Sequence, residues 1–481
     1  MVIAALIPYL ALSAALQPLT PVIAHSLHMS LQEMSLSSGM ANAAYAVGTV
    51  LAVQFALLLP QRRMMVVYAV ILVVASTLTA AAQDPAMYIT GHVLQGLCTS
   101  LLLIAAVPPL VIGYPASRMR STAIIMNMCI FGAVALGPAI GGIQAHSDSW
   151  RPLFWVVAVI AVVALVLSVL TFEDAPPADP TAPRDPLAIG LAAAGSAAAF
   201  YGASELLTHR FLDVPTFGFL IGGLALIVLL VVNQSVRRRP LLTIRSMLVS
   251  TMPVAGIVVA LFAAAASVSA IELTAASLAH RYGPLHIGLL YLPEFAGAIL
   301  TAGLLGLVFN KRAIHYLPLV GMALLAAGIA VFRVEIPPSQ ALTLLGSGLV
   351  GIGLGATVAP ALFVAGFSLP SANLQRVFAI VELLRAVAAF MIAPVFAHLA
   401  ATVGGSPQAG TGIALWIGFA LAVSGALLGV LLYVLGRARP QKPALEQFMD
   451  GDAPAWYSPP LLAGLRKQYS VSSLAEEPAG T

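Results

Sequence analysis

His92, Glu272 and Glu294 are ionisable residues that stand inside long apolar stretches of this chain. Ionisable side chains within a bilayer are costly, and they usually face the interior of a helix bundle. Glu272 has no opposite charge within one helical turn, so desolvation favours its protonated form. Glu294 follows Pro293, where a broken helix frees a backbone carbonyl and widens a cavity. These three residues are therefore our candidates for carrying a proton.

Other ionisable residues in the apolar stretches allow more than one interpretation. His92 changes charge near neutral pH, as a proton carrier must, but a neutral histidine bonded to a neighbouring helix explains it equally well. Glu382 and Arg385 are three residues apart, so they share one helix face and can pair. A paired arginine is the least costly way to keep both charges in a membrane. For this pair we favour a structural role.

Several polar or aromatic side chains in apolar stretches are candidates for lining a substrate cavity: Gln17, Tyr45, Gln54, Gln95, Asn127 and Tyr291. Ordinary hydrogen bonding between helices explains each of them more readily. If Glu272 and Glu294 line the cavity, their charge favours cationic substrates in a low-dielectric site. A neutral or anionic natural product is the alternative.

Gly137, Pro138, Gly141 and Gly142 lie inside one long apolar stretch, where glycine and proline are individually unfavourable. A membrane helix tolerates them when it needs a bend and a smooth face for close approach of another helix. We expect this run to lie at the interface between two moving helix bundles.

The composition places these residues in a membrane protein. Of the 481 residues, 60% are apolar and only 8% are Asp, Glu, Lys or Arg, too few to cover a soluble domain. Cys98 and Cys129 both stand in apolar stretches and are interpreted as small buried side chains rather than a disulfide. No phosphate-binding Gly-x-x-x-x-Gly-Lys motif and no hydrolase motif occurs. We expect no enzymatic activity, no cofactor, no metal site and no nucleic-acid partner.

Apolar stretches of about 20 residues, the length that spans a bilayer, number fourteen in this chain. The sequence therefore predicts an all-α integral membrane protein with these spans: 3–24, 39–59, 64–82, 86–112, 121–145, 152–172, 187–207, 215–233, 247–279, 286–309, 315–332, 341–366, 376–402 and 412–435.

The distribution of basic residues predicts the orientation. Placing both termini in the cytoplasm puts seventeen of the 22 Lys and Arg residues on that side, four outside, and Arg385 within a span. We therefore expect a multi-pass protein of the cell (inner or plasma) membrane. The run Arg237 to Arg239 is interpreted as a topological anchor, with binding of anionic lipid headgroups as the alternative.

Composition also divides the chain into segments. We predict a six-helix bundle over residues 1–172, a cytoplasmic loop with two extra membrane helices over 173–245, and a second six-helix bundle over 246–436. Residues 437–481 are polar and proline-rich, which favours a disordered cytoplasmic tail.

Several motifs occur in the order found in one family of transporters. The exit of the first span reads Thr20-Pro21-Val22-Ile23-Ala24, and the fourth span contains Gln95-Gly96. The fifth span carries Gly137-Pro138 and Gly141-Gly142. The chain resembles the fourteen-helix drug:proton antiporter branch of the major facilitator superfamily. This resemblance implies the major facilitator fold, with six, two and six membrane helices, and proton-driven export of drug-like compounds.

The chain departs from the family pattern at positions linked to proton coupling. Leu12 stands where the family has an aspartate in the first span, and His92 replaces the arginine of the fourth span. The loop after the second span keeps its arginine as Arg62, but Gln61 replaces an aspartate that helps to hold the outward-facing state. The resemblance therefore implies the fold more firmly than it implies the coupling.

Together these observations predict a secondary active transporter that exports small hydrophobic or amphiphilic compounds by proton antiport and alternating access. Its partners are a small-molecule substrate, protons and membrane lipid, and one chain is long enough to act as a monomer. The alternatives are a proton-independent uniporter or flippase of the same fold and a non-transporting membrane sensor or scaffold.

Overall fold

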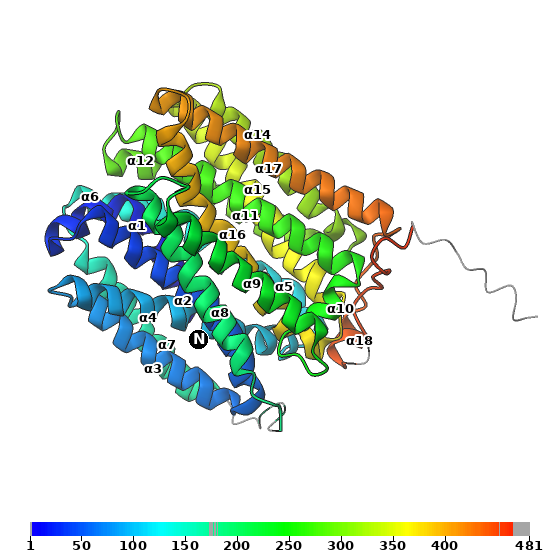
Figure 1. Cartoon of the computed structure of the whole chain (residues 1–481). Coiled ribbons are helices and arrows are strands. Elements are labelled where there is room, and N and C mark those ends of the chain that lie inside the picture. Colours follow the sequence, from blue (N-terminus) through cyan, green and yellow to red (C-terminus); the bar gives the residue numbers. More distant parts are fainter. Residues whose placement is uncertain (1, 173–176, 178, 180, 452, 465–481) are drawn as a thin grey trace, which may run out of the picture.

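A computed structural model provides the fold, and it describes residues 2–172, 177, 179, 181–451 and 453–464. The described chain is built from helices that run back and forth between two ends of the molecule, from upper left to lower right in the view of Figure 1. The long helices and helix pieces are α1 (Val2–Leu27), α2 (Leu31–Leu58), α3 (Gln61–Ala80), α4 (Pro85–Ile112), α5 (Met119–Asn127), α6 (Ala133–His146), α7 (Arg151–Thr171), α8 (Pro186–Ser204), α9 (Phe219–Val236), α11 (Thr251–Leu278), α12 (Pro284–Leu290), α13 (Leu292–Val308), α14 (Leu317–Arg333), α15 (Gln340–Phe367), α16 (Leu374–Thr402) and α17 (Pro407–Leu435).

Each of the fourteen predicted spans coincides with one helix or with two consecutive pieces. In the described residues, thirteen helical segments are long and apolar enough to cross a membrane, and α14 is a shorter apolar helix of 17 residues. The fifth span is α5 and α6, joined by a π-helical turn at Met128–Gly132. The predicted span over 286–309 is broken into α12 and α13, and the break lies just before Pro293. The predicted fold class is confirmed.

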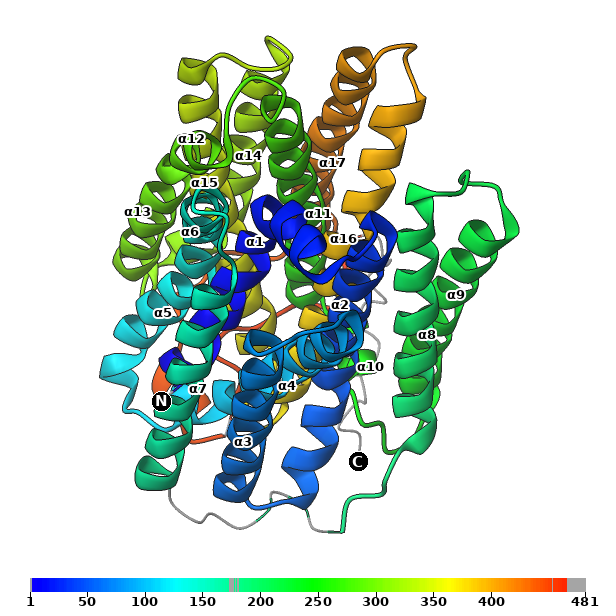
Figure 2. The same ribbon diagram turned by 90° about the vertical axis from the view of Figure 1, so that its left-hand side faces the viewer.

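Two groups of helices form the body of the molecule. In the first group α1 packs against α6 and α7, and α3 and α2 pack against α4. In the second group α11 packs against α15, α16 and α17, and α14 packs against α15. The groups meet where α2 contacts α16 and where α5 and α6 contact α13 and α12. Figure 2 shows α8 and α9 side by side at one edge of the molecule, with α8 packed on α2.

Because consecutive helices alternate in direction, the loops gather at two ends of the molecule. The end that contains the α2–α3 loop, residues 437–451 and residues 453–464 is called the tail end, and the opposite end is called the far end. Short helices α10 (Ile244–Leu248) and α18 (Leu445–Met449) lie at the tail end (Figure 1).

The prediction of a disordered tail is wrong for residues 437–451 and 453–464. Trp456 is buried, and its Nε1 donates a 2.7 Å hydrogen bond to Ser368 Oγ at the end of α15. The ring of Phe448 is buried 4.6 Å from that of Phe367. Two aromatic side chains thus hold this segment against α15, although its overall composition is polar and proline-rich. Residues 465–481 lie outside the described residues.

Candidate functional site

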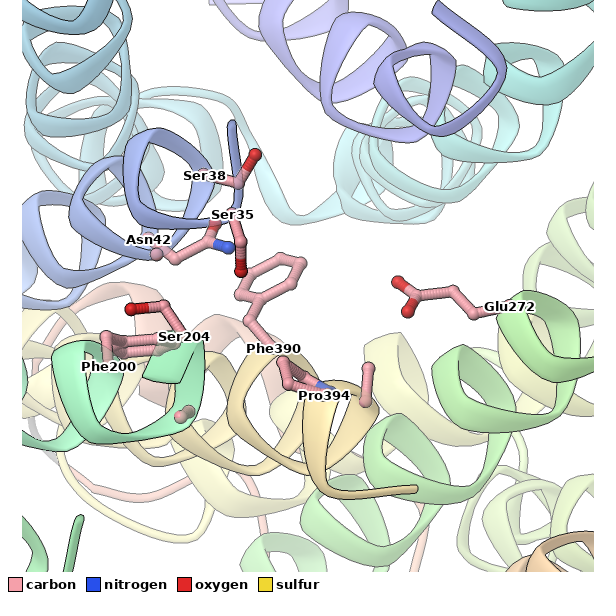
Figure 3. Close-up of a pocket in the computed structure, with 11 residues that line it drawn as sticks. Ser35, Ser38, Asn42, Phe200, Ser204, Glu272, Phe390 and Pro394 are labelled. Atoms are coloured by element: carbon pink, nitrogen blue, oxygen red, sulfur yellow. The ribbon is translucent and has the colours of Figure 1, made fainter. Parts of the chain in front are cut away.

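A pocket of about 160 Å³ lies in the far half of the molecule, where α2 and α8 face α11 and α16 (Figure 3). One wall therefore comes from the first helix group, one from the second group and one from α8, which forms a pair with α9 that we call the lateral pair. The lining residues are Ser35, Ser38, Gly39, Asn42, Phe200, Ala203, Ser204, Glu272, Phe390, Ala393 and Pro394.

Glu272 is the one ionisable side chain among the described residues that line this pocket. Figure 3 shows its carboxylate extending from α11 into the space that separates α11 from α2 and α8. Within the described part of the chain, no side chain forms a hydrogen bond or ion pair with that carboxylate. Its backbone carbonyl accepts a 3.4 Å hydrogen bond from Gln17 Nε2 of α1. Gln17 therefore lies beside the site on the first helix group.

The α2 wall is lined by small polar side chains. Ser35, Ser38 and Asn42 recur at intervals of three and four residues, so they share one face of the helix. Their side chains form no hydrogen bond with other described residues and are only partly exposed. Facing them, the Phe390 ring projects from α16 (Figure 3). The pocket thus combines free hydrogen-bonding groups, an aromatic ring and one carboxylate.

A polar triad, in which Tyr45 and Glu382 are buried and Arg385 is partly buried, lies on the tail side of the pocket. Tyr45 of α2 donates a 3.1 Å hydrogen bond to Glu382 Oε2 of α16. Arg385 binds the same oxygen through Nε at 3.0 Å and through Nη2 at 2.7 Å. This is the local pairing that the spacing of Glu382 and Arg385 predicts, and Tyr45 extends it across the two helix groups.

Glu294 and Tyr291 lie away from the pocket, within the second helix group. The Glu294 side chain is buried, and its backbone packs so closely on Gly351 of α15 that a Cβ there would lie 2.6 Å from Glu294 Cα. The Tyr291 hydroxyl donates a 3.3 Å hydrogen bond to the Ile271 carbonyl of α11. Glu272 and Glu294 therefore differ in the structure, since Glu272 lines the pocket and Glu294 does not, although both are equal candidates in the sequence.

His92 and Gln95 lie inside the first helix group. The His92 ring is buried and stacks on Tyr88 with ring centroids 5.8 Å apart. Tyr88 in turn contacts the rings of Trp150 and Phe154 edge-on. Gln95 Nε2 donates a 3.1 Å hydrogen bond to Ser76 Oγ of α3. Neither residue lines the pocket.

Gln54 and Asn127 also lie outside the pocket. At the tail end, Gln54 Oε1 accepts a 2.8 Å hydrogen bond from the backbone N–H of Asp185, which caps α8. Asn127 is fully buried directly before the π-helical turn, and neither of its amide atoms has a partner among the described residues. None of the six cavity candidates lines the pocket, but Gln17 lies beside it through the Glu272 carbonyl and Tyr45 lies on its tail side.

The glycine-rich run of α6 serves two different contacts. A Cβ on Gly141 would lie 2.7 Å from Pro18 Cγ, and Gly137 faces Ala11 and Ala14, so both pack against α1 of the same helix group. Gly142 instead faces Pro284 of α12 in the other group, where a Cβ would lie 2.5 Å from the carbonyl oxygen.

Pro138 takes part in the same contact, because a Cβ on Gly288 would lie 2.6 Å from its carbonyl oxygen. The expectation that the whole run lies between the bundles therefore holds for Pro138 and Gly142 and is wrong for Gly137 and Gly141. Glycines spaced by four share one helix face, which here points at α1.

Arg62 and Asp185 fix helix ends at the tail end. Arg62 Nη2 donates a 3.0 Å hydrogen bond to the Val169 carbonyl in the last turn of α7. Asp185 accepts hydrogen bonds from Gln234 Nε2 at 2.8 Å and pairs with Arg237 Nη1 at 2.6 Å. Arg237 is therefore held by Asp185, whereas Arg238 and Arg239 form no ion pair within the described residues.

Sequence reasoning missed the α2 and α8 walls of the pocket. The signal was present in Ser35, Ser38 and Asn42, a row of small polar residues on one face of an apolar helix. For Phe200 and Ser204 no comparable signal exists, because an aromatic and a serine are ordinary residues in a membrane helix. Only the packing of α8 on α2 brings them to the pocket.

Comparisons with known proteins agree with this architecture. The family model of the Major Facilitator Superfamily matches residues 1–310. The fold superimposes on the proton:xylose symporter XylE, in a structure bound to 6-bromo-6-deoxy-D-glucose, with a TM-score of 0.60, 12% sequence identity, and coverage of 89% of this chain and 93% of XylE. At this identity the likeness concerns the fold alone.

The curated relatives are transporters that match this chain over part of their length. The chain is 26% identical to the uncharacterized MFS-type transporter YubD of Bacillus subtilis, over 66% of this chain and 62% of YubD. It is 24% identical to the drug efflux pump JefA of Mycobacterium tuberculosis, over 66% of this chain and 64% of JefA. The chain thus spans less than two thirds of either relative.

Proposed function

Because the chain belongs to the major facilitator superfamily, we propose that it is a secondary active transporter that exports small hydrophobic or amphiphilic compounds in exchange for protons. The observation that carries this proposal is the lone Glu272 carboxylate in a pocket lined by both helix groups. A carboxylate without a partner among the described residues is free to bind either a proton or a cationic substrate. Distant similarity to a drug efflux pump supports the same substrate class.

In this proposal the tail end faces the cytoplasm and the far end faces the outside of the cell membrane. The excess of Lys and Arg in the loops of the tail end supports that orientation. The pocket then lies in the outer half of the membrane. The chain acts as a monomer, with residues 1–172 and 246–436 as the two bundles that move against each other.

Alternating access requires that the bundles part on one side of the substrate while they close on the other. Tyr45 is three residues from Asn42 along α2, a rise of about 4.5 Å toward the tail end. Arg385 is five residues from Phe390 along α16, a rise of about 7.5 Å in the same direction. The hydrogen bond between Tyr45 and Glu382 therefore closes the cytoplasmic side of the pocket, and it must break for a substrate to enter from the cytoplasm.

At the outer side, closure depends on the contact of Pro138 and Gly142 with α12. The absence of side-chain atoms at Gly142 lets the two backbones approach to within contact distance. This contact would open when the outer side opens. The two contacts thus lie on opposite sides of the pocket, as a rocking motion of two bundles requires.

In this proposal Glu272 couples proton import to cation export, because the proton and the cation compete for the same carboxylate. A protonated Glu272 is neutral and stays without a counter-charge, whereas the carboxylate is stabilised by a bound cation. Release of the cation to the outside therefore favours uptake of a proton, which is carried inward and released to the cytoplasm. One site serves both ligands in turn.

A proton-independent uniporter or flippase of the same fold is the second candidate. It is favoured by Leu12, which is fully buried in an apolar cluster at the position where related antiporters have an aspartate. Proton movement separates the two candidates.

Everted membrane vesicles that hold a respiratory pH gradient, reported by acridine orange, provide the test. Addition of tetraphenylphosphonium or ethidium should dissipate part of the gradient in vesicles with the protein and not in vesicles without it. Accumulation of the cation with no change in the dye signal would contradict antiport and favour the uniporter.

A further inference from the structure

We infer that α8, a helix of the lateral pair, forms part of the substrate site: Phe200, Ala203 and Ser204 shape a subsite for an aromatic ring of the transported cation. This inference rests on the proposed function and adds to it the identity of the wall that selects the substrate. The lateral pair would then determine specificity in addition to filling space at the edge of the fold.

The lateral pair is a rigid unit. Gly195, Ala199 and Gly223 allow the backbones of α8 and α9 to meet, because a Cβ on Gly223 would lie 2.6 Å from the Gly195 carbonyl oxygen and 2.7 Å from Ala199 Cα. Close contact through small residues is a stable way to pair helices in a membrane. Any residue that α8 presents to the pocket is therefore held in a defined position.

This unit is fastened to both bundles around the pocket. On the side of the first bundle, Gln54 binds the Asp185 N–H at the tail end, and Gln32 donates a 3.3 Å hydrogen bond to the Glu205 carboxylate at the far end. On the side of the second bundle, His398 of α16 lies 2.9 Å from the Leu206 carbonyl oxygen through its Nδ1. The α8 wall thus bridges the two bundles beside the pocket.

The size and chemistry of the pocket indicate what it holds. Its volume of about 160 Å³ is close to that of a cavity that accepts one benzene ring. Phe200 and Phe390 provide aromatic surfaces from α8 and α16, and Figure 3 shows the Phe390 ring near the hydroxyl and amide groups of α2. Glu272 supplies the only charge among the described lining residues. An organic cation with an aromatic ring could place that ring in the pocket and pair its charge with the Glu272 carboxylate.

Small side chains on α8 keep this space open. Ala203 and Ser204 are both buried and line the pocket, and the Ser204 hydroxyl is already bonded to the Tyr201 carbonyl at 2.7 Å. Ser204→Leu would place three additional carbon atoms against the pocket. Ala194, on the exposed side of the same helix, offers a matched control for added bulk.

The test measures transport of tetraphenylphosphonium in proteoliposomes that contain the full chain. Ser204→Leu should raise KM by about tenfold, a difference of about 1.4 kcal/mol in binding, with kcat unchanged. Ala194→Leu should retain the parent KM. A merely structural lesion would instead lower kcat and the amount of folded protein, without a selective rise in KM. Equal KM values for Ser204→Leu and Ala194→Leu would overturn the inference.

A binding measurement separates failure of the subsite from failure of the proposed function. Cys98 and Cys129 are buried, so a Ser38→Cys variant introduces the one partly exposed thiol of the described residues. Tetraphenylphosphonium should protect this thiol from a charged thiosulfonate reagent, and Ser204→Leu should reduce that protection. Transport of the cation without protection would refute the subsite and leave the exporter intact. If the cation is neither transported nor protective, both the substrate class and the subsite are wrong.

Discussion

The Tyr45 hydroxyl donates a 3.1 Å hydrogen bond to the Glu382 carboxylate, and this bond joins α2 of the first bundle to α16 of the second. The same carboxylate oxygen accepts two bonds from Arg385. Glu382 is therefore held by its own helix and by the opposite bundle at once. Removal of the Tyr45 hydroxyl releases the bond between bundles and leaves the ion pair in place.

Tyr45→Phe should therefore weaken closure of the cytoplasmic side without unfolding the protein. A buried hydrogen bond to a charged group contributes about 1.5–3 kcal/mol, enough to shift the balance between open states by about tenfold or more. The expected result is increased labelling, from the cytoplasmic side, of a cysteine introduced at Asn42. Unchanged labelling with unchanged transport would exclude Tyr45 from the closing contact.

Arg385→Met should be more damaging than Tyr45→Phe, because it leaves the buried Glu382 without its ion-pair partner. Loss of one partner of a buried pair typically costs about 3–5 kcal/mol. Thermal unfolding in detergent should show a lower midpoint for Arg385→Met, and Glu382→Leu added to it should restore much of the loss. If the double variant is as unstable as the sum of the single variants, the pair is not the source of the effect.

Gly142→Leu should block transport while the protein still inserts and folds. The added side chain prevents close approach of α6 and α12 at the outer side, so the pocket stays open to the outside. Gly141→Leu should instead lower the amount of folded protein, since its side chain meets α1 within one bundle. Gly190→Leu serves as the control, because an added Cβ at Gly190 would have no atom of another described element within 4 Å. Normal transport by Gly142→Leu would remove this contact from the mechanism.

Docking of residues 437–451 and 453–464 should weaken as the pH falls. His315 lies at the tail end, before α14 begins at Leu317, and its ring packs on that of Trp456 with centroids 4.7 Å apart. Burial lowers the pKa of His315 from 6.5 to about 4. A released tail exposes His315, which then binds a proton below pH 6.5. Docking is therefore strongest above pH 6.5 and is progressively lost between pH 6.5 and pH 4.

Limited proteolysis of the tail over this pH range measures the effect. His315→Asn should abolish the pH dependence, and Trp456→Ala should expose the tail at every pH, because truncation of a buried tryptophan costs about 3–5 kcal/mol. Cleavage of the parent protein that does not vary between pH 7 and pH 4.5 would contradict the assignment to His315.

The fold was predictable because lipid imposes one strong rule. Every backbone polar group in a bilayer must be bonded internally, so fourteen apolar stretches become helices or broken helices. The spacing of Glu382 and Arg385 was also sufficient to predict their contact, since three residues on a helix span one turn. These inferences need only information that is local in the sequence.

The pocket was less predictable because it depends on which helices meet. Gln54 and Gln95 have the polarity of cavity residues, yet each bonds to a neighbouring element, Asp185 in one case and Ser76 in the other. Glu272 and Glu294 look equivalent in sequence, but only Glu272 reaches the pocket. The docked tail was missed for the same reason, because Trp456 finds its partner Ser368 far away in the chain.

Glu272→Gln in proteoliposomes is the most direct test of the central claim, that one carboxylate alternately binds a proton and the exported cation. The parent protein should move protons when tetraphenylphosphonium is added, reported by a trapped pH-sensitive dye. The variant should show no substrate-dependent proton movement and should no longer accumulate the cation against its gradient. Proton movement at the parent rate in Glu272→Gln would contradict the account.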